Sequence, residues 1–493
     1  MGVIAKQSIK GTIVTYIGVA VGFVTTFFVL TRFLSAEEIG LARVLIDAAM
    51  LFVGLAQLGT TSSIIRFFPY FKDDARAHGF FFWAFVVPLI GFIVFAMVYW
   101  GCSVPIAAWF GDKSPLFVNY YYFVLPMAFF MLYQSVFETC SNVRMHIVVP
   151  RAVREVLVRI GLLVCYLLYA FEVLSIDGFV IAICLNYGLA ALVNFSYLLS
   201  LGKISLRPDW AFLRANPGLV RSYLLYTGFL IISALTSVLA PTLSSFFITA
   251  KMGLNYTGIF AIATYMAVMV SIPYRSVVAI TQPELAQTIK NNDRENTSRL
   301  IAQASSTLLL TGAFIFLLIW INIDLIFSLL PNGELYASAK YVVLLLGIGQ
   351  LMVTTFSVFN PALSYSKYYA FSLLNSLVLT GSAILLNNAL IPPLGMDGAA
   401  LATVLSDICY YALVMTITCI ALRMQPFTKK HLLTLLLAVV LFGLNELWLR
   451  VELVDSVWMS VLRTVVLLGG GFVVAWKLNL SPEINALLRR IRI

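Results

Sequence analysis

Charged residues are scarce in this sequence. Asp, Glu, Lys and Arg make up 11% of the 493 residues, and 61% of the residues are hydrophobic. A soluble domain carries about 25% charged residues. The apolar residues are grouped in runs long enough to cross a bilayer as helices, which takes about 20 residues each. The composition therefore excludes a soluble globular protein and predicts an all-α integral membrane protein.

Catalytic and metal-binding motifs are also missing. The sequence has no P-loop, no HExxH pattern and no paired carboxylates in a large loop, and its longest predicted loops are residues 201–221 and 282–300. The six cysteines are scattered without metal-ligand spacing, so we interpret them as small core residues. We therefore expect neither an enzyme nor a bound cofactor or metal ion. The net charge of +10 lies in short loops, which argues against nucleic acid as a partner.

The apolar runs predict fourteen transmembrane helices. With a cytoplasmic N-terminus, this map places most of the 32 lysines and arginines on the cytoplasmic side, as the positive-inside rule requires, and the C-terminus is cytoplasmic too. The predicted spans are 11–33, 39–66, 79–101, 117–139, 153–174, 178–200, 222–249, 256–281, 301–330, 339–360, 368–391, 397–422, 431–449 and 457–478.

Two halves of the chain are similar to each other. A shift of 218 residues places 34–76 on 252–294 and aligns Gly40 with Gly258. An even number of spans per half gives two parallel lobes, as in some transporters. The predicted parts are an N-lobe (1–200), a cytoplasmic linker (201–221), a C-lobe (222–422), two further spans (423–478) and an amphipathic cytoplasmic tail (479–493) on the membrane surface.

Three charges inside two of these spans are the first functional candidates. Each costs roughly 2.5–3.5 kcal/mol on insertion scales. Arg43 and Asp47 are one helical turn apart, so Arg43 can extend to the outer surface with Asp47, one turn deeper, as its partner. Arg275 has no acid within four residues. It either extends to the inner surface or lines a water-filled, positively charged cavity.

Further polar residues accompany these charges. The 218-residue shift aligns Gln57 with Arg275, and Tyr274 is adjacent to Arg275. Arg32 and Lys251 lie at matched outer ends of the first and seventh spans, and Arg66 lies at the inner end of the second. This basic track suits a phosphate-bearing substrate. Ser, Thr and Gly in the same spans have an alternative role in close helix packing.

Acidic residues follow a different distribution. The first and seventh spans contain neither Asp nor Glu, which argues against cation coupling. Asp324 and Glu446 fall near outer ends of spans, where we expect capping of helix boundaries. Asp407 lies deeper in its span, and the sequence does not explain it.

The segment "LTRFLSAEEIGLARVL" resembles the first loop and second span of Wzx-type polysaccharide-biosynthesis flippases. These belong to the multidrug/oligosaccharidyl-lipid/polysaccharide exporter superfamily. The resemblance rests on Arg32 and on the Leu-x-x-Glu-Glu-x-Gly turn at 34–40. "MGLNYTGIFAIA", at 252–263, resembles the equivalent turn of the second lobe. The 6 + 6 + 2 arrangement of spans resembles the superfamily over essentially the whole chain.

The resemblance implies alternating access around a cavity formed by spans 1, 2, 7 and 8 in a bacterial inner membrane. It also implies export of an undecaprenyl-pyrophosphate-linked oligosaccharide whose pyrophosphate is bound by cavity arginines. The expected partners are this substrate, membrane lipids and other polysaccharide assembly proteins. Two alternatives stay open: a drug/cation antiporter that loads on Asp47, and an integral-membrane glycan polymerase, ligase or glycosyltransferase, against which the short outer loops argue.

Overall fold

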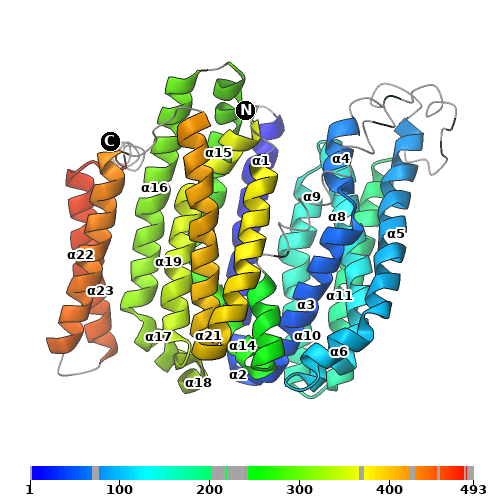
Figure 1. Cartoon of the computed structure of the whole chain (residues 1–493), viewed down its shortest axis with the longest axis horizontal. Coiled ribbons are helices and arrows are strands. Elements are labelled where there is room, and N and C mark those ends of the chain that lie inside the picture. The colour runs from blue at the N-terminus through cyan, green and yellow to red at the C-terminus, as the bar shows by residue number, and fades with distance from the viewer. Residues whose placement is uncertain are drawn as a thin grey trace. The chain divides into compact units, whose positions relative to one another are not determined.

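Every regular element in the described part of the chain is a helix (Figure 1). The computed structural model describes residues 3–68, 77–202, 242–291, 293–365, 371–421, 428–451 and 456–481, with the single residues 208, 210, 218, 221, 239 and 485. Ten helical segments within these residues are long and apolar enough to cross a membrane. The chain is therefore a multi-pass, all-helical integral membrane protein. The total of fourteen spans and the side on which the termini lie stay predictions.

The described helices fall into two compact units, Met1–Gly258 and Ile259–Ile493. The first unit contains α1 (Val3–Val24), a π-helix η1 (Thr25–Leu30), α2 (Thr31–Phe33), α3 (Ala36–Ala56), α4 (Thr60–Phe67), α5 (Ala77–Gly101), α6 (Ser103–Phe110), α7 (Pro115–Tyr120), η3 (Tyr121–Phe123), α8 (Val124–Val143), α9 (Val148–Ala152), a π-helix η4 (Val153–Leu157), α10 (Val158–Ala170) and α11 (Ile176–Ser200). Residues 242–251 are also helical.

Helix α8 is the central element of the first unit. It packs against α3, α4, α5 and α11 (Figure 1). Phe81 of α5, Val136 of α8 and Leu198 of α11 belong to one fully buried cluster with Ile64 of α4. This apolar packing fixes the second span against the fourth.

The second unit is built around α16. Its elements are the remainder of α14 (Leu254–Val268), η5 (Met269–Ser271), α15 (Ile272–Lys290), α16 (Arg294–Ile321), α17 (Ile323–Leu329), α18 (Gly333–Ala337), α19 (Lys340–Phe356), α20 (Phe359–Tyr365), α21 (Phe371–Ala421), α22 (Lys429–Val451) and α23 (Val457–Lys477). Helix α16 contacts α15, α19, α22 and α23. The described parts of the predicted spans 368–391 and 397–422 both lie within α21, which is kinked at Gly395 (φ 58°).

Several spans that the sequence presents as continuous are interrupted. The predicted span 39–66 consists of α3 and α4, separated by Leu58 (φ 46°) and Gly59 (φ 66°). The predicted span 256–281 consists of α14 and α15, separated by the 3₁₀ turn η5. Most of the predicted span 222–249, the linker 201–221 and the tail 479–493 lie outside the described residues.

Candidate functional site

The turn that resembles the flippase family starts helix α3. The Ser35 side chain accepts a hydrogen bond from the Glu38 backbone N–H (3.3 Å), and the Ser35 N–H donates to the Glu38 carboxylate (2.8 Å). This capping box satisfies two backbone donors at the helix start. The Tyr169 hydroxyl of α10 donates to the same carboxylate. Ser35 and Glu38 thus have a structural role in fixing where the second span begins.

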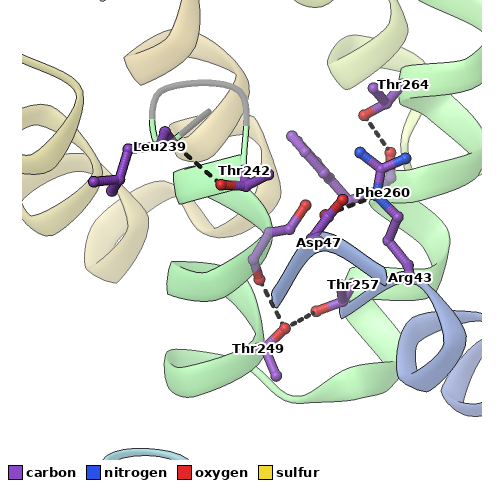
Figure 2. A network of polar contacts seen from close by, with 9 residues as sticks. Arg43, Asp47, Leu239, Thr242, Thr249, Thr257, Phe260 and Thr264 are labelled. Atoms are coloured by element: carbon purple, nitrogen blue, oxygen red, sulfur yellow. Dashed lines mark hydrogen bonds and ion pairs between the residues drawn. The ribbon is translucent and has the colours of Figure 1, made fainter. Parts of the chain in front are cut away.

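The structure brings Arg43 and Asp47 together on α3. The Nε of Arg43 lies 2.8 Å from a carboxylate oxygen of Asp47 (Figure 2). The Asp47 side chain is 4% exposed and that of Arg43 is 24% exposed. Ser245 also interacts with the Asp47 carboxylate. The pairing predicted from the one-turn spacing is therefore confirmed. The pair leaves no net charge at this depth of the span.

Hydroxyl groups near this pair bond within the protein (Figure 2). Thr249 donates to the Ser245 carbonyl (2.7 Å) and shares a hydrogen bond with the Thr257 hydroxyl (2.9 Å). The Ser114 hydroxyl donates to the Thr249 carbonyl (2.7 Å). All four hydroxyls are buried. Helix packing therefore accounts for these Ser and Thr residues, as the alternative interpretation of the sequence expected.

The two glycines that the 218-residue shift aligns are in contact within the first unit. A Cβ on Gly40 would lie 2.0 Å from the Leu254 carbonyl oxygen, and one on Gly258 would lie 1.9 Å from the Ala36 carbonyl oxygen. Neither position can take a side chain unless the backbones separate. The beginnings of α3 and α14 thus meet backbone to backbone.

Three further predicted site residues of the first unit, Arg32, Arg66 and Lys251, are cations. Arg32 and Arg66 are exposed, each over a neighbouring ring, Phe33 or Phe67. Arg32 lies in α2, before α3 begins, and Arg66 lies in the last turn of α4. Lys251 is partly buried over the Phe247 ring, and this burial lowers the pKa of the ammonium group.

Gln57 marks the end of α3. It is the C-cap residue, and its side-chain oxygen accepts a hydrogen bond from the Thr61 hydroxyl (3.2 Å) across the interruption. Its side chain is partly exposed. Gln57 therefore connects α3 to α4, and it keeps an amide nitrogen that can serve a ligand.

The partner stretch in the second unit holds Tyr274 and Arg275. Both are in the first turn of α15, which begins after η5 with Pro273 in its first two positions. Tyr274 packs on a core cluster that includes Leu285 and Ile301. The backbone of Arg275 is helical, and its side chain is outside the part of the chain that the structure describes.

Isolated acids of the second unit have mostly structural partners. Asp324 forms an ion pair with Lys340 (2.7 Å), and Glu446 accepts a hydrogen bond from the Trp320 indole (3.1 Å). Neither side chain caps a helix: both acids bond to other side chains, so the capping expected from the sequence is wrong for these two residues. Arg463 of α23 is buried and donates to the carbonyl of Ile321 at the end of α16 (2.8 Å).

Sequence reasoning missed a charged network in the first unit. Arg154 contacts Glu138 of α8 (2.9 Å) and Glu155 of η4 (3.5 Å), and Arg159 contacts Glu155 (3.1 Å). The only local signal is the spacing of four between Glu155 and Arg159. Glu138 lies 16 residues before Arg154, so only the packing of the fourth span on the fifth shows this pair.

No metal site stands out among the described residues. They contain no group of three or more His, Cys, Asp or Glu side chains that could hold an ion. The six cysteines, all described, are free.

The fold is shared with solved transporters. The Lipid II flippase MurJ in an inward closed conformation is similar over 95% of this chain and 99% of its own, with a TM-score of 0.72 and 13% identity. A multidrug resistance MATE family transporter of the MOP superfamily, in an inward-facing conformation, matches over 84% of this chain and 94% of its own (TM-score 0.63, 14% identity). A MOP superfamily transporter from Pyrococcus furiosus matches over 85% and 97% (TM-score 0.56, 14% identity).

These similarities define the class: the protein has the fold of MOP superfamily transporters rather than that of an enzyme. A comparison with curated proteins finds no significant match. The profile of the polysaccharide biosynthesis protein family matches residues 4–289, more than half of the sequence. The chain belongs to this family.

Proposed function

We propose that the protein is a flippase that exports an undecaprenyl-pyrophosphate-linked oligosaccharide across the bacterial inner membrane for surface polysaccharide biosynthesis. The observation that carries this proposal is the family match over residues 4–289, combined with a MurJ-like fold along 95% of the chain. MurJ is described as a lipid II flippase. A substrate of the same chemical kind would pair with the basic residues of the two stretches, 34–76 and 252–294, that the 218-residue shift aligns.

The proposed arrangement has fourteen spans and two cytoplasmic termini. Two six-helix lobes, 1–200 and 222–422, are joined by the linker 201–221 and followed by the two further spans and the tail. The lobes alternate between inward-open and outward-open states around a polar cavity. The lipid tail stays in the bilayer, so the cavity needs to accommodate only the head group and the glycan.

The basic residues bind the pyrophosphate at successive points of this path. Arg275 and Arg66 bind the pyrophosphate from the cytoplasmic side, since guanidinium groups pair with phosphate oxygens in a bidentate manner. Arg43 and Arg32 receive it toward the outer side, where Lys251 adds a third cation. Gln57, which the 218-residue shift aligns with Arg275, and Tyr274 contact the first sugars.

The Arg43–Asp47 ion pair favours the flippase over the drug/cation antiporter. An antiporter would load a proton or a cationic drug on Asp47, and that carboxylate is buried against a guanidinium 2.8 Å away. A second cation there would have to displace Arg43. The pair thus leaves Asp47 poorly placed as a cation-loading site.

The decisive experiment is a translocation assay in reconstituted vesicles. A defined undecaprenyl-pyrophosphate-linked glycan is placed in vesicles with and without the purified protein, and its appearance on the opposite leaflet is followed with and without a proton or sodium gradient. We expect protein-dependent translocation that is lost in Arg275→Ala and Arg275→Gln and retained, per folded molecule, in Asp47→Asn.

Other results would change the assignment. Abolition by Asp47→Asn with full activity in both Arg275 variants would favour the antiporter. Formation of new glycosidic bonds by the purified protein would instead identify a polymerase, ligase or glycosyltransferase.

A further inference from the structure

Two carboxylates and two arginines form a closed network where α8, η4 and α10 meet. Arg154 bridges Glu138 and Glu155 at 2.9 and 3.5 Å, and Arg159 contacts the other oxygen of Glu155 at 3.1 Å. The four side chains carry no net charge together. The proposed substrate path does not use any of them.

The backbone is shaped around this network. Residues Val153–Leu157 form a π-helical turn, a local defect that is frequent at functional sites. Helix α1 comes so close that a Cβ on Gly18 would lie 2.2 Å from the Glu155 carbonyl oxygen, and one on Gly22 would lie 3.0 Å from the Arg159 guanidinium. Arg159 donates to the Gly18 carbonyl (2.7 Å). The glycines of α1 thus leave the space that Arg159 occupies.

The two kinds of side chain differ in exposure. Glu138 and Glu155 are 10% and 11% exposed, whereas Arg154 is 51% and Arg159 is 30% exposed. Within the described residues, the Nη2 group of Arg154 has no hydrogen-bond partner. Glu155 contacts Nε and Glu138 contacts Nη1, so Nη2 of this half-exposed guanidinium can still donate to a second anion.

We propose that this network is a proton-coupled binding site for a phosphate group, and that its physiological ligand is a lipid-linked diphosphate. The diphosphate binds the Nη1 and Nη2 groups of Arg154 together and so displaces Glu138 from Nη1. The released carboxylate would be a buried charge without its partner, which costs several kcal/mol. Glu138 therefore takes up one proton from the adjoining water. The inference rests on the proposed function only for the source of the diphosphate.

Surrounding charges are compatible with this exchange. Arg151 of α9 acts on Glu138 from the neighbouring turn, and Arg154 and Glu155 are the other charges that act on it. Neither residues 13–24 of α1 nor residues 178–200 of α11 contain a charged side chain, and their titratable groups near neutral or basic pH are Tyr16, Cys184, Tyr187 and Tyr197. Protonation of Glu138 thus leaves three guanidinium groups against one carboxylate and favours a bound anion.

Calorimetric titration of the purified full-length protein with inorganic pyrophosphate tests the site. Buffers with different ionisation enthalpies report the protons taken up, and the proton exchange of the ligand itself is the same for every variant. The wild type should take up about one more proton per bound diphosphate than Glu138→Gln, which should bind about tenfold more tightly at neutral pH because the competitor is gone.

Variants of the arginine provide the second readout. Arg154→Gln should weaken binding about ten- to a hundredfold, as expected for a lost charge-assisted contact, and Arg154→Lys should weaken it less. The matched control is Arg144→Gln, because Arg144 lies at the end of α8 and contacts Phe81 and the Gly202 carbonyl instead of the network. Wild-type affinity in Arg154→Gln, or equal proton uptake in the wild type and Glu138→Gln, would overturn the proposal.

Competition in mixed micelles identifies the source of the phosphate. Undecaprenyl pyrophosphate should displace inorganic pyrophosphate, whereas phosphatidylglycerol should not. Equal displacement by phosphatidylglycerol would overturn the assignment to the lipid carrier and indicate a bilayer lipid. None of these measurements depends on translocation. The binding-site proposal can therefore be contradicted while the transport proposal holds, and the transport proposal can be contradicted while the binding site holds.

Discussion

The second span and the stretch that the 218-residue shift aligns with it are both interrupted helices, but they differ in how their charges are compensated. In the first unit, α3 begins at a capping box, carries a neutralised charge pair and is interrupted by the left-handed Leu58 and Gly59. In the related stretch, α14 is interrupted by a 3₁₀ turn, and α15 restarts with Pro273 and Arg275. One stretch compensates its arginine locally, and the other has no acid within four residues of it.

This difference indicates where a ligand can supply binding energy. A cation that already contacts a buried carboxylate gains little from an anionic substrate, because the new contact replaces an old one. A cation without an acid nearby in sequence gains a partner. We therefore expect Arg275 to contribute more to substrate binding than Arg43.

The largest effect is expected from removing the charge of Arg275. Arg275→Gln should lower translocation of the lipid-linked glycan in vesicles about ten- to a hundredfold, and Arg43→Gln should lower it less. Thermal unfolding of the detergent-solubilised proteins controls for folding. Equal losses in the two variants would remove the contrast between the spans, and full activity of Arg275→Gln would contradict the proposed anion path.

An effect on stability, rather than on transport, is expected from breaking the ion pair of α3. Asp47→Asn leaves Arg43 without its carboxylate and should lower the free energy of unfolding by about 3 kcal/mol, the lower part of the range for buried pairs because Arg43 is partly exposed. The double variant Arg43→Gln/Asp47→Asn should recover most of the loss. A double-mutant cycle in denaturant measures the coupling. Additive losses would show that the two side chains act separately.

The glycine contact should give a smaller effect again. Gly40→Ala or Gly258→Ala places a Cβ about 2 Å from a carbonyl oxygen, and overpacking of this kind costs about 1–3 kcal/mol. Gly443→Ala in α22 is the matched control, since its Cβ would meet no atom within 4 Å. Thermal unfolding should separate the first two variants from the third. Three equal melting temperatures would show that α3 and α14 do not depend on close approach.

The smallest effect is expected at the turn that follows α15. Asp293 caps α16, and its hydrogen bonds with Asn296 lower the pKa of the carboxyl group. A depressed pKa means that this contribution to stability is present near neutral pH and is lost as the pH falls through the lowered value. Asp293→Asn should flatten the acid limb of the stability profile. An unchanged profile would contradict the cap's ionic contribution.

Periodicity and hydropathy were sufficient for the class of fold and for one pair in the site. Long apolar runs predicted the transmembrane helices, and the one-turn spacing predicted the contact between Arg43 and Asp47. Both signals are local, because a helix places residues i and i+4 on one face whatever its neighbours are.

The features that the sequence did not predict depend on tertiary packing. The shift aligned Gly40 with Gly258 as equivalents, and their contact depends on how α3 and α14 are placed. Glu138 and Arg154 come from different helices. The interruption at Leu58 and Gly59 had no strong local signal, since a leucine with positive φ is held there by surrounding packing rather than by its own preference.

The hydrogen bond between Arg463 and the Ile321 carbonyl sets a limit on how the chain can be shortened. The predicted repeat ends before α22 and α23, which suggests a removable C-terminal hairpin. However, this hairpin supplies the donor for the carboxyl end of α16, and Glu446 of the same hairpin accepts a hydrogen bond from the Trp320 indole N–H. Truncation before residue 429 would leave the last turn of α16 without these partners. Affinity tags and fusion partners therefore belong after α23.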